Sequence, residues 1–325
     1  MNLEFGCLVP QGWRKDLPQT DSYKDLVSGV VSVAREAERT GYDSLWVYDH
    51  LVTYPNPGHE PCLEAWTTLS FLAGIIGKAK LGQLVTCNSY RAPTLLAKIG
   101  ASFDNLCRGR LIFGIGAGWY EDEYLQYGYS FPGARERILR LAEAVAIIKS
   151  MWTTPTTTLS GKYYEVRSAI CEPKTIQKPR PPILIGGSGP KRTLRVVADH
   201  ADISNFAGSP EEFGERLLAL RNHCAKIGRD FDSIRKSCLF DVLVGRSRTE
   251  WEQKIERFHK LHAPSVSREE YLRRRIYGTP DECASKLKKY VQMGASYFMF
   301  YFPDSVELEP VTSFAEEVIP SLEKR

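Results

Sequence analysis

The stretch KLGQLVTCNSYRAPTLLAKIGASFDNLCRGRLIFGIG, from Lys80 to Gly116, decides the fold class. Its two ends, Lys80–Thr86 and Leu111–Ile115, are short apolar runs of the kind that form buried strands. Between them, Pro93–Leu106 repeats apolar residues at helical spacing. A strand, a helix and a second strand in this order predict two parallel strands joined by a helix.

The same alternation of strand and helix runs along the whole chain. We predict strands at Leu3–Val9, Ser44–Tyr48, Lys80–Thr86, Leu111–Ile115, Ile183–Ile185, Ala201–Asn205, Lys236–Val244 and Ser296–Phe302. We predict helices at Tyr23–Arg39, Leu63–Ile76, Pro93–Leu106, Glu136–Trp152, Lys191–Ala198, Glu211–Ile227, Thr249–His262 and Asp281–Met293. Eight such units predict an α/β fold, the (β/α)8 TIM barrel, because closing a parallel sheet removes both exposed edges. An open doubly wound sheet is the alternative.

Two helix starts are marked most clearly by the sequence. Ser209-Pro210-Glu211-Glu212 and Thr279-Pro280-Asp281-Glu282 each place a hydroxyl residue before a proline and an acid three positions later. This is the pattern of a capping box, in which the hydroxyl and the acid satisfy free backbone N–H groups.

We expect residues 1–325 to form a single domain, because α/β barrels reach this size and no Gly/Ser-rich or Pro-rich linker divides the chain. Two segments exceed the minimal repeat, namely 153–182, which contains a predicted hairpin at Thr157–Tyr164, and 263–278. We expect both to be insertions on the C-terminal side of the strands, where long insertions form lids or interfaces.

Composition excludes several classes of protein. The net charge of +4, from 43 basic and 39 acidic residues, is too small and too dispersed for a dedicated nucleic-acid binder. No apolar run reaches the roughly 18 residues needed to cross a membrane, and the N-terminus has no signal-peptide pattern. Eight cysteines occur singly, as in the reducing cytoplasm, and the six histidines lack the spacing of metal ligands. We therefore expect a cytoplasmic protein without a metal site.

In a parallel barrel the active site lies where the strands end, so the residues there are the candidates for chemistry. Asp49 and His50 follow the second strand, and histidine, with an ordinary pKa of about 6.5, is suited to proton transfer at neutral pH. A turn cap and a packed ring are the simpler explanation of this pair. Glycines at alternate positions in Gly114–Gly118 allow a ligand to approach the backbone, although a tight turn explains them equally well.

A third candidate is Gly186-Gly187-Ser188-Gly189-Pro190, which leads from a strand into a helix. Free N–H groups and the helix dipole at such a turn favour an anion, and Lys191 and Arg192 add positive charge. The pattern predicts a phosphate site. Aromatic residues near strand ends suit a flat ring system, although core packing explains most of them: Trp13, Trp46, Tyr48, Tyr90, Trp119, Tyr120 and Tyr301.

Together these motifs resemble the luciferase-like oxidoreductase superfamily, and most closely its coenzyme F420-dependent, deazaflavin-using branch. The resemblance rests on GYDSLWVYDH (41–50), LEAWTTL (63–69), YRAPTLLAK (90–98), GRLIFGIGAGWYEDE (109–123) and PILIGGSGPKRTLR (182–195), and it covers nearly the whole chain. It implies a barrel, a homodimer, coenzyme F420 as cofactor, and hydride transfer to or from a small organic substrate. It also implies a cis non-proline peptide bond within Gln83–Thr86.

The resemblance also assigns site residues. It implies His50 as the catalytic residue. We expect the substrate to contact Trp13, Tyr90 and Trp119. The implied cofactor contacts are Asp49, Thr86, Ala117, Gly118, Asp122, Gly186, Gly187, Ser188, Gly189 and Pro190.

One departure from the resemblance limits the substrate. The branch that oxidises sugar phosphates has a catalytic Glu where this chain has Trp119, which argues against a sugar phosphate. An FMN-dependent monooxygenase and a non-catalytic flavin-binding protein are the alternatives. The basic run Arg273–Arg275 can serve as an anion site, a solvated helix face or a dimer contact, and the sequence does not choose among them.

Overall fold

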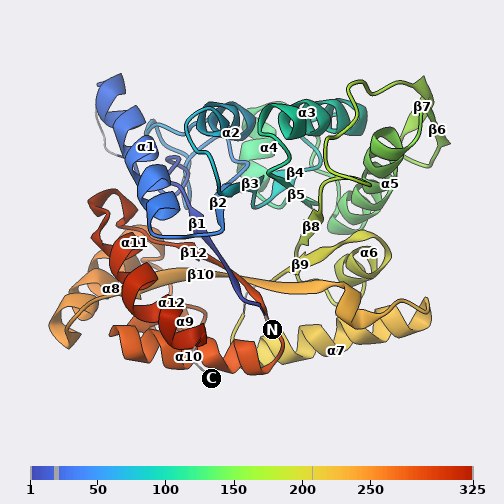
Figure 1. Ribbon diagram of the computed structural model, residues 1–325. Helices are drawn as coiled ribbons and strands as arrows, with labels where there is room; N and C mark the ends of the chain where they lie inside the picture. The colour runs from blue at the N-terminus through green and yellow to red at the C-terminus, as the bar shows by residue number, and fades with distance from the viewer. Residues whose placement is uncertain (1, 18–21, 207, 324–325) are drawn as a thin grey trace.

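The computed structural model describes residues 2–17, 22–206 and 208–323, which contain a closed barrel of parallel strands (Figure 1). In order around the barrel these are β1 (Glu4–Leu8), β2 (Ser44–Val47), β3 (Lys80–Gln83), β5 (Leu111–Gly116), β8 (Ile183–Gly186), β9 (Ile203–Asn205), β10 (Arg235–Val244) and β12 (Tyr297–Tyr301). Strand β10 pairs with both β9 and β12, and β12 pairs with β1, which closes the ring. The predicted (β/α)8 barrel is confirmed, and the open sheet is wrong.

The third strand is interrupted, because the predicted strand Lys80–Thr86 forms β3 and a separate β4 (Thr86–Cys87) that pairs with β5. The Leu84–Val85 peptide bond between them is cis. This confirms the cis bond that the resemblance implied.

Helices follow the strands at the predicted places. They are α1 (Tyr23–Arg39), α2 (Ala65–Ala73), α3 (Pro93–Leu106), α5 (Ala134–Thr153), α6 (Thr193–His200), α7 (Pro210–Lys226), α8 (Arg248–His262) and α10 (Pro280–Gln292). Shorter helices are α4 (Glu121–Gln126), α9 (Arg268–Leu272), η1 (Phe231–Ser233) and η2 (Ser305–Glu307). Both predicted capping boxes are formed, at Ser209 and Thr279.

The last barrel helix differs from the prediction. Helices α8 and α10 both lie between β10 and β12, so one of them is not a separate barrel unit. The eighth position is filled by α11 (Glu309–Ser313), a π-helical turn (Phe314–Val318) and α12 (Ile319–Glu323), which pack between α1 and α10. Pro310 lies in the first turn of α11, where proline is tolerated, but Pro320 and the π-helical turn before it break the helical period of this segment, which explains why periodicity missed it.

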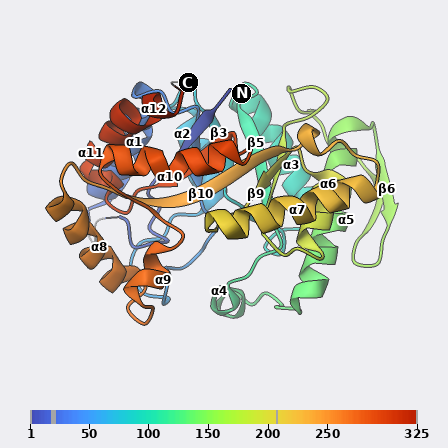
Figure 2. The same cartoon turned by 90° about the horizontal axis from the view of Figure 1, so that it is seen from below.

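The two insertions lie at different places in the repeat. Segment 263–278 contains α9 and β11 (Ile276–Gly278) and follows β10 through α8, as predicted. Figure 2 shows α9 at the same end of the barrel as α4. Segment 153–182 instead connects α5 to β8, so it does not follow the carboxyl end of a strand, contrary to the prediction. Its hairpin, β6 (Thr157–Ser160) and β7 (Glu165–Ala169), folds back along α5.

The barrel interior is filled by large side chains, among which Trp46 and Tyr297 are fully buried. The Trp46 indole N–H and the Tyr297 hydroxyl both donate to the Ser44 hydroxyl, at 2.8 and 2.7 Å. Gly82 leaves room for the indole, since a Cβ there would lie 2.5 Å from its ring. These rings form a solid floor, and the ligand space lies above it, toward the strand carboxyl ends.

No helix in the described ranges is long and apolar enough to span a bilayer. All eight cysteines are free, and seven of them are buried.

Candidate active site

A cavity of about 330 Å³ opens at the carboxyl ends of the strands. Its wall is drawn from loops after β1, β2, β4, β5 and β8, and from the first turns of α5 and α6. The residues lining it include Trp13, Tyr48, Asp49, His50, Leu84, Val85, Cys87, Tyr90, Gly116, Ala117, Gly118, Trp119, Tyr120, Arg137, Gly186, Gly187 and Thr193. Most of the sequence-predicted site residues are thus brought together in one place.

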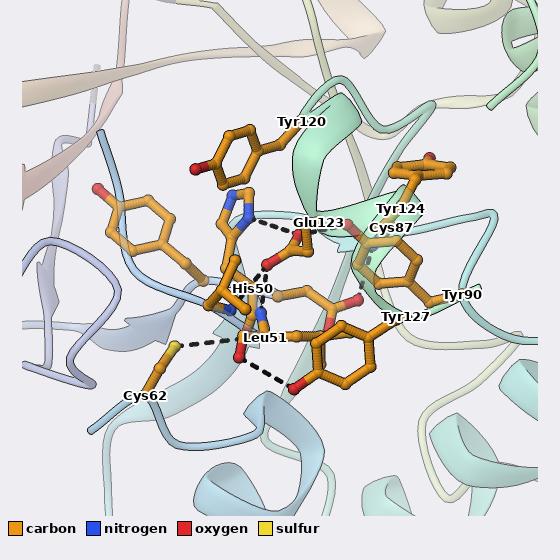
Figure 3. A network of polar contacts seen from close by, with 12 residues as sticks. His50, Leu51, Cys62, Cys87, Tyr90, Tyr120, Glu123, Tyr124 and Tyr127 are labelled. Atoms are coloured by element: carbon orange, nitrogen blue, oxygen red, sulfur yellow. Dashed lines mark hydrogen bonds and ion pairs between the residues drawn. The ribbon is translucent and has the colours of Figure 1, made fainter. Parts of the chain in front are cut away.

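His50 is held by a carboxylate that lies 73 residues away in the chain. Its Nδ1 is 3.0 Å from Oε2 of Glu123, which projects from α4 (Figure 3). An ionised carboxylate only accepts hydrogen bonds, so the Nδ1 proton points at Glu123. The other nitrogen, Nε2, makes no hydrogen bond within the described residues and is left for a ligand.

Glu123 itself is fully buried and saturated with donors. Besides His50, it accepts from the N–H groups of Leu51 and Val52 and from the Tyr90 hydroxyl. Burial alone would raise the pKa of Glu123, but the contacts with His50, Tyr90 and Leu51 outweigh it and lower that pKa. Glu123 is therefore an anion that fixes both the orientation and the tautomer of His50.

Four aromatic rings surround the imidazole of His50. Trp13 stacks on it, with ring centroids 4.0 Å apart and planes 5° apart. Tyr120 and Trp119 present edges at 6.0 and 5.9 Å, and Tyr48 lies at 6.5 Å. These rings fix the imidazole from several sides and make its surroundings apolar.

Asp49 lies beside His50 but its carboxylate is already engaged. Arg91 donates to both oxygens, at 2.7 and 3.0 Å, and the Cys87 N–H donates at 2.8 Å. Burial raises the pKa of Asp49, and the Arg91 guanidinium opposes that shift. Asp49 thus ties the loop after β2 to the segment after β4, so the structure gives it a structural role next to the ligand space.

The far wall of the cavity is suited to an anion. Gly186 and Gly187 line it, and the φ of Gly187 is +126°, a conformation that L-residues rarely adopt. Thr193, the first residue of α6, lines the same wall, so the positive end of the helix dipole faces the cavity. Arg137 of α5 also lines the cavity, and the Nε of its guanidinium donates to the Gly118 carbonyl at 3.2 Å.

Comparison with known protein families identifies the family to which this chain belongs. The model of the luciferase-like monooxygenase family matches residues 3–273. The chain belongs to this family. A relative named F420-dependent glucose-6-phosphate dehydrogenase, from Microbacterium testaceum, is 29% identical over 314 residues, covering 89% of this chain and 91% of the relative.

Two further similarities are informative. A relative from Mycobacterium bovis named phthiodiolone/phenolphthiodiolone dimycocerosates ketoreductase is 28% identical over 307 residues, covering 87% of this chain and 76% of the relative. A solved structure of an F420-dependent secondary alcohol dehydrogenase with an F420-acetone adduct aligns over 100% of both chains, with a TM-score of 0.84 and 18% identity. At that identity the structural match supports the shared barrel only.

In this luciferase-like chain several predicted contacts lie outside the cavity wall. Thr86 is buried, and its hydroxyl donates to the Gln83 side chain at 2.6 Å. Asp122 is exposed on the first turn of α4. Ser188, Gly189 and Pro190 continue the glycine turn beyond the residues that line the cavity. Their roles in cofactor binding stay predictions.

Sequence reasoning missed Glu123 and Arg137. Glu123 stands in a run of three acids, Glu121-Asp122-Glu123, and the run gives no sign of which one is turned inward. Arg137 lies in an ordinary amphipathic helix. Only the three-dimensional structure shows that Glu123 contacts His50 and that Arg137 lines the cavity.

The basic run near the second insertion is neutralised in this luciferase-like fold. Asp241 on β10 accepts from both Arg14 and Arg275, at 2.8 and 2.9 Å. Arg273 and Arg274 pair with Glu212 at the start of α7. The run therefore fastens the insertion to the barrel and to α7.

Proposed function

We propose that this protein is a coenzyme F420-dependent oxidoreductase that transfers a hydride between the deazaflavin and a small organic substrate. The observation that carries the proposal is one cavity with a histidine–carboxylate pair on one wall and a glycine turn with a helix start on another. The similarity to relatives named F420-dependent over about nine-tenths of the chain supports the choice of cofactor.

The residues present fit such a cofactor. Leu84, Val85 and Ala117 give the cavity an apolar wall for a flat ring. Gly116 and Gly186 let Val85 take its place in this wall, because a Cβ on either would lie 2.6 or 2.9 Å from the Val85 side chain. Gly186 to Pro190, the start of α6 and Arg137 would hold the phosphate.

When bound, the deazaflavin supplies a carrier for one hydride. The protein's own residues supply orientation and proton transfer. Glu123 keeps the Nδ1 proton of His50 in place, so Nε2 can accept a proton from a substrate hydroxyl or return one to it. The surrounding rings exclude water from that position. The homodimer stays a prediction from the resemblance, and the cytoplasmic location stays a prediction from the cysteine pattern of the sequence.

Equilibrium binding of the purified protein to coenzyme F420 and, in parallel, to FMN tests the proposal. We expect F420 to bind with at least tenfold higher affinity, a difference of about 1.4 kcal/mol. Preference for FMN, with oxygen consumption on adding reduced FMN, would instead place the protein among the monooxygenases. Tight cofactor binding with no turnover of any alcohol, ketone or imine would favour the non-catalytic alternative.

A further inference from the structure

The substrate side of the cavity is built from aromatic rings. Trp119, Tyr120, Trp13 and Tyr48 all line the cavity and all lie within 6.5 Å of the His50 ring, centroid to centroid. Tyr54 supports them from behind, with edge contacts of 5.6 Å to Trp119 and 5.7 Å to Tyr120. The reacting position next to His50 is therefore enclosed by ring faces and edges.

Trp119 is the part of this enclosure open to an incoming molecule. Trp119 is 53% exposed to solvent, whereas Trp13 and Tyr120 are each 6% exposed. A large apolar ring left exposed at the rim of a cavity is available to cover a ligand that fills the space beneath it.

Few charged side chains line the cavity. Asp49 is the only acid and Arg137 the only arginine or lysine among the described residues that line the cavity. Asp49 is bound by Arg91. Arg137 has no carboxylate partner among the described residues, but under the proposed function it would hold the cofactor phosphate.

The nearby cations outside the wall are also engaged. Arg14 and Arg275 share the carboxylate of Asp241. Among the described residues, Arg137 is thus the one arginine or lysine on the cavity wall, and the proposed function assigns it to the cofactor phosphate. An anionic group beside His50 would therefore lose its hydration without a cation of its own, which is costly in an apolar enclosure.

We propose that the substrate of this site is an uncharged molecule with a flat or apolar body and one hydroxyl or carbonyl oxygen. The oxygen lies within reach of His50 Nε2, and the apolar body packs under Trp119. This inference rests on the proposed function and narrows it to a substrate class that excludes sugar phosphates and carboxylates.

Calorimetric titration of the F420-loaded protein tests the inference with three probes: acetophenone, 4-acetylbenzoate and glucose 6-phosphate. The first two share one skeleton and differ by a carboxylate. We expect acetophenone to bind at least about tenfold more tightly than the other two, because only it avoids burying an unpaired charge.

Substitutions of Trp119 test whether acetophenone binds next to this side chain. We expect Trp119→Ala to weaken acetophenone binding about three- to tenfold, the range of one aromatic contact, and Trp119→Phe to restore most of it. Leu125→Ala, at an exposed position on α4 outside the cavity wall, is the matched control and should leave the affinity unchanged.

Equal or tighter binding of 4-acetylbenzoate or glucose 6-phosphate would overturn the inference. So would the absence of saturable acetophenone binding, or binding that is insensitive to Trp119→Ala. Failure of the proposed function is a separate result, because F420 affinity is measured first. If F420 does not bind, the same titrations on the cofactor-free protein still decide the substrate class.

Discussion

Replacing Glu123 by glutamine isolates the contribution of a single buried charge. The carboxylate accepts from His50, Tyr90 and the N–H groups of Leu51 and Val52. The amide oxygen of glutamine can keep the two backbone N–H groups, and the Tyr90 hydroxyl can rotate to accept instead of donate. The His50 Nδ1 proton then faces an amide that also donates, so this contact cannot survive in its present form.

The expected loss of stability follows from these contacts. Hydrogen bonds to a charged group contribute about 1.5–3 kcal/mol each, and a neutral amide weakens those to His50 and Tyr90 and forces His50 into its other tautomer, so we expect a loss of about 3 kcal/mol. At about 2 °C per kcal/mol for a chain of this size, the melting temperature should fall by about 6 °C. Glu121→Gln, at an exposed position on the same helix, should change stability by less than about 0.5 kcal/mol.

The pH dependence has a definite sign. Because the folded protein lowers the pKa of Glu123 below its ordinary value of 4.5, the ionised side chain stabilises the fold above that pH. That contribution is lost as the pH falls through the lowered pKa. The difference in unfolding free energy between the native protein and Glu123→Gln should therefore be largest near neutral pH and shrink below about pH 4.5.

Two measurements check this prediction. Urea unfolding between pH 3.5 and 7.5 gives the stability difference, and nitrogen NMR of the imidazole reports which ring nitrogen of His50 carries the proton. We expect the proton on Nδ1 in the native protein and on Nε2 in Glu123→Gln. A stability difference that does not vary with pH, or an unchanged tautomer, would refute the role given to Glu123.

Three further substitutions test other parts of the site. Arg137→Met should weaken F420 binding by about tenfold or more, the strength of one charge-assisted contact, and leave binding of the phosphate-free deazaflavin nucleoside unchanged; equal losses would contradict a phosphate contact. Gly118→Ala should destabilise the fold by about 1–3 kcal/mol in urea unfolding, because its φ is +77° and a Cβ would overlap the Tyr124 hydroxyl; native-like stability would contradict this. Asp241→Asn should cost about 3–5 kcal/mol and make the segment around Arg275 a site of proteolytic cleavage, because it leaves buried cations without a partner; an unchanged cleavage pattern would contradict the fastening role.

The sequence predicted the barrel well because its signals are local and repeated. Each buried strand is a short apolar run, and the capping boxes at Ser209 and Thr279 mark helix starts without reference to the rest of the chain. The eighth helix was missed because Pro320 and the π-helical turn before it break the helical pattern, and only packing against α1 and α10 shows its place. The hairpin of segment 153–182 was misplaced for a related reason, since sequence length does not say at which end of the barrel a connection emerges.

The candidate site was predicted less completely. His50, Trp13, Tyr90 and Trp119 line one cavity as expected, because residues after parallel strands meet at one end of a barrel. The partner of His50 could not be predicted, because it depends on which acid of α4 turns inward. The salt bridge between Asp49 and Arg91 could not be predicted either, because it joins residues 42 positions apart in the sequence.

Trp46 and Tyr297 close the lower part of the barrel interior, so the cavity opens only at the carboxyl ends of the strands. Cofactor, substrate and product must all pass the loops that follow the strands, since the packed rings below leave no second route. A single opening imposes an order of dissociation, because a ligand near the opening must leave before a ligand deeper in the cavity can exchange. A substrate bound under Trp119 should therefore slow the release of the cofactor. The two dissociation rates should be coupled without any conformational change in the protein.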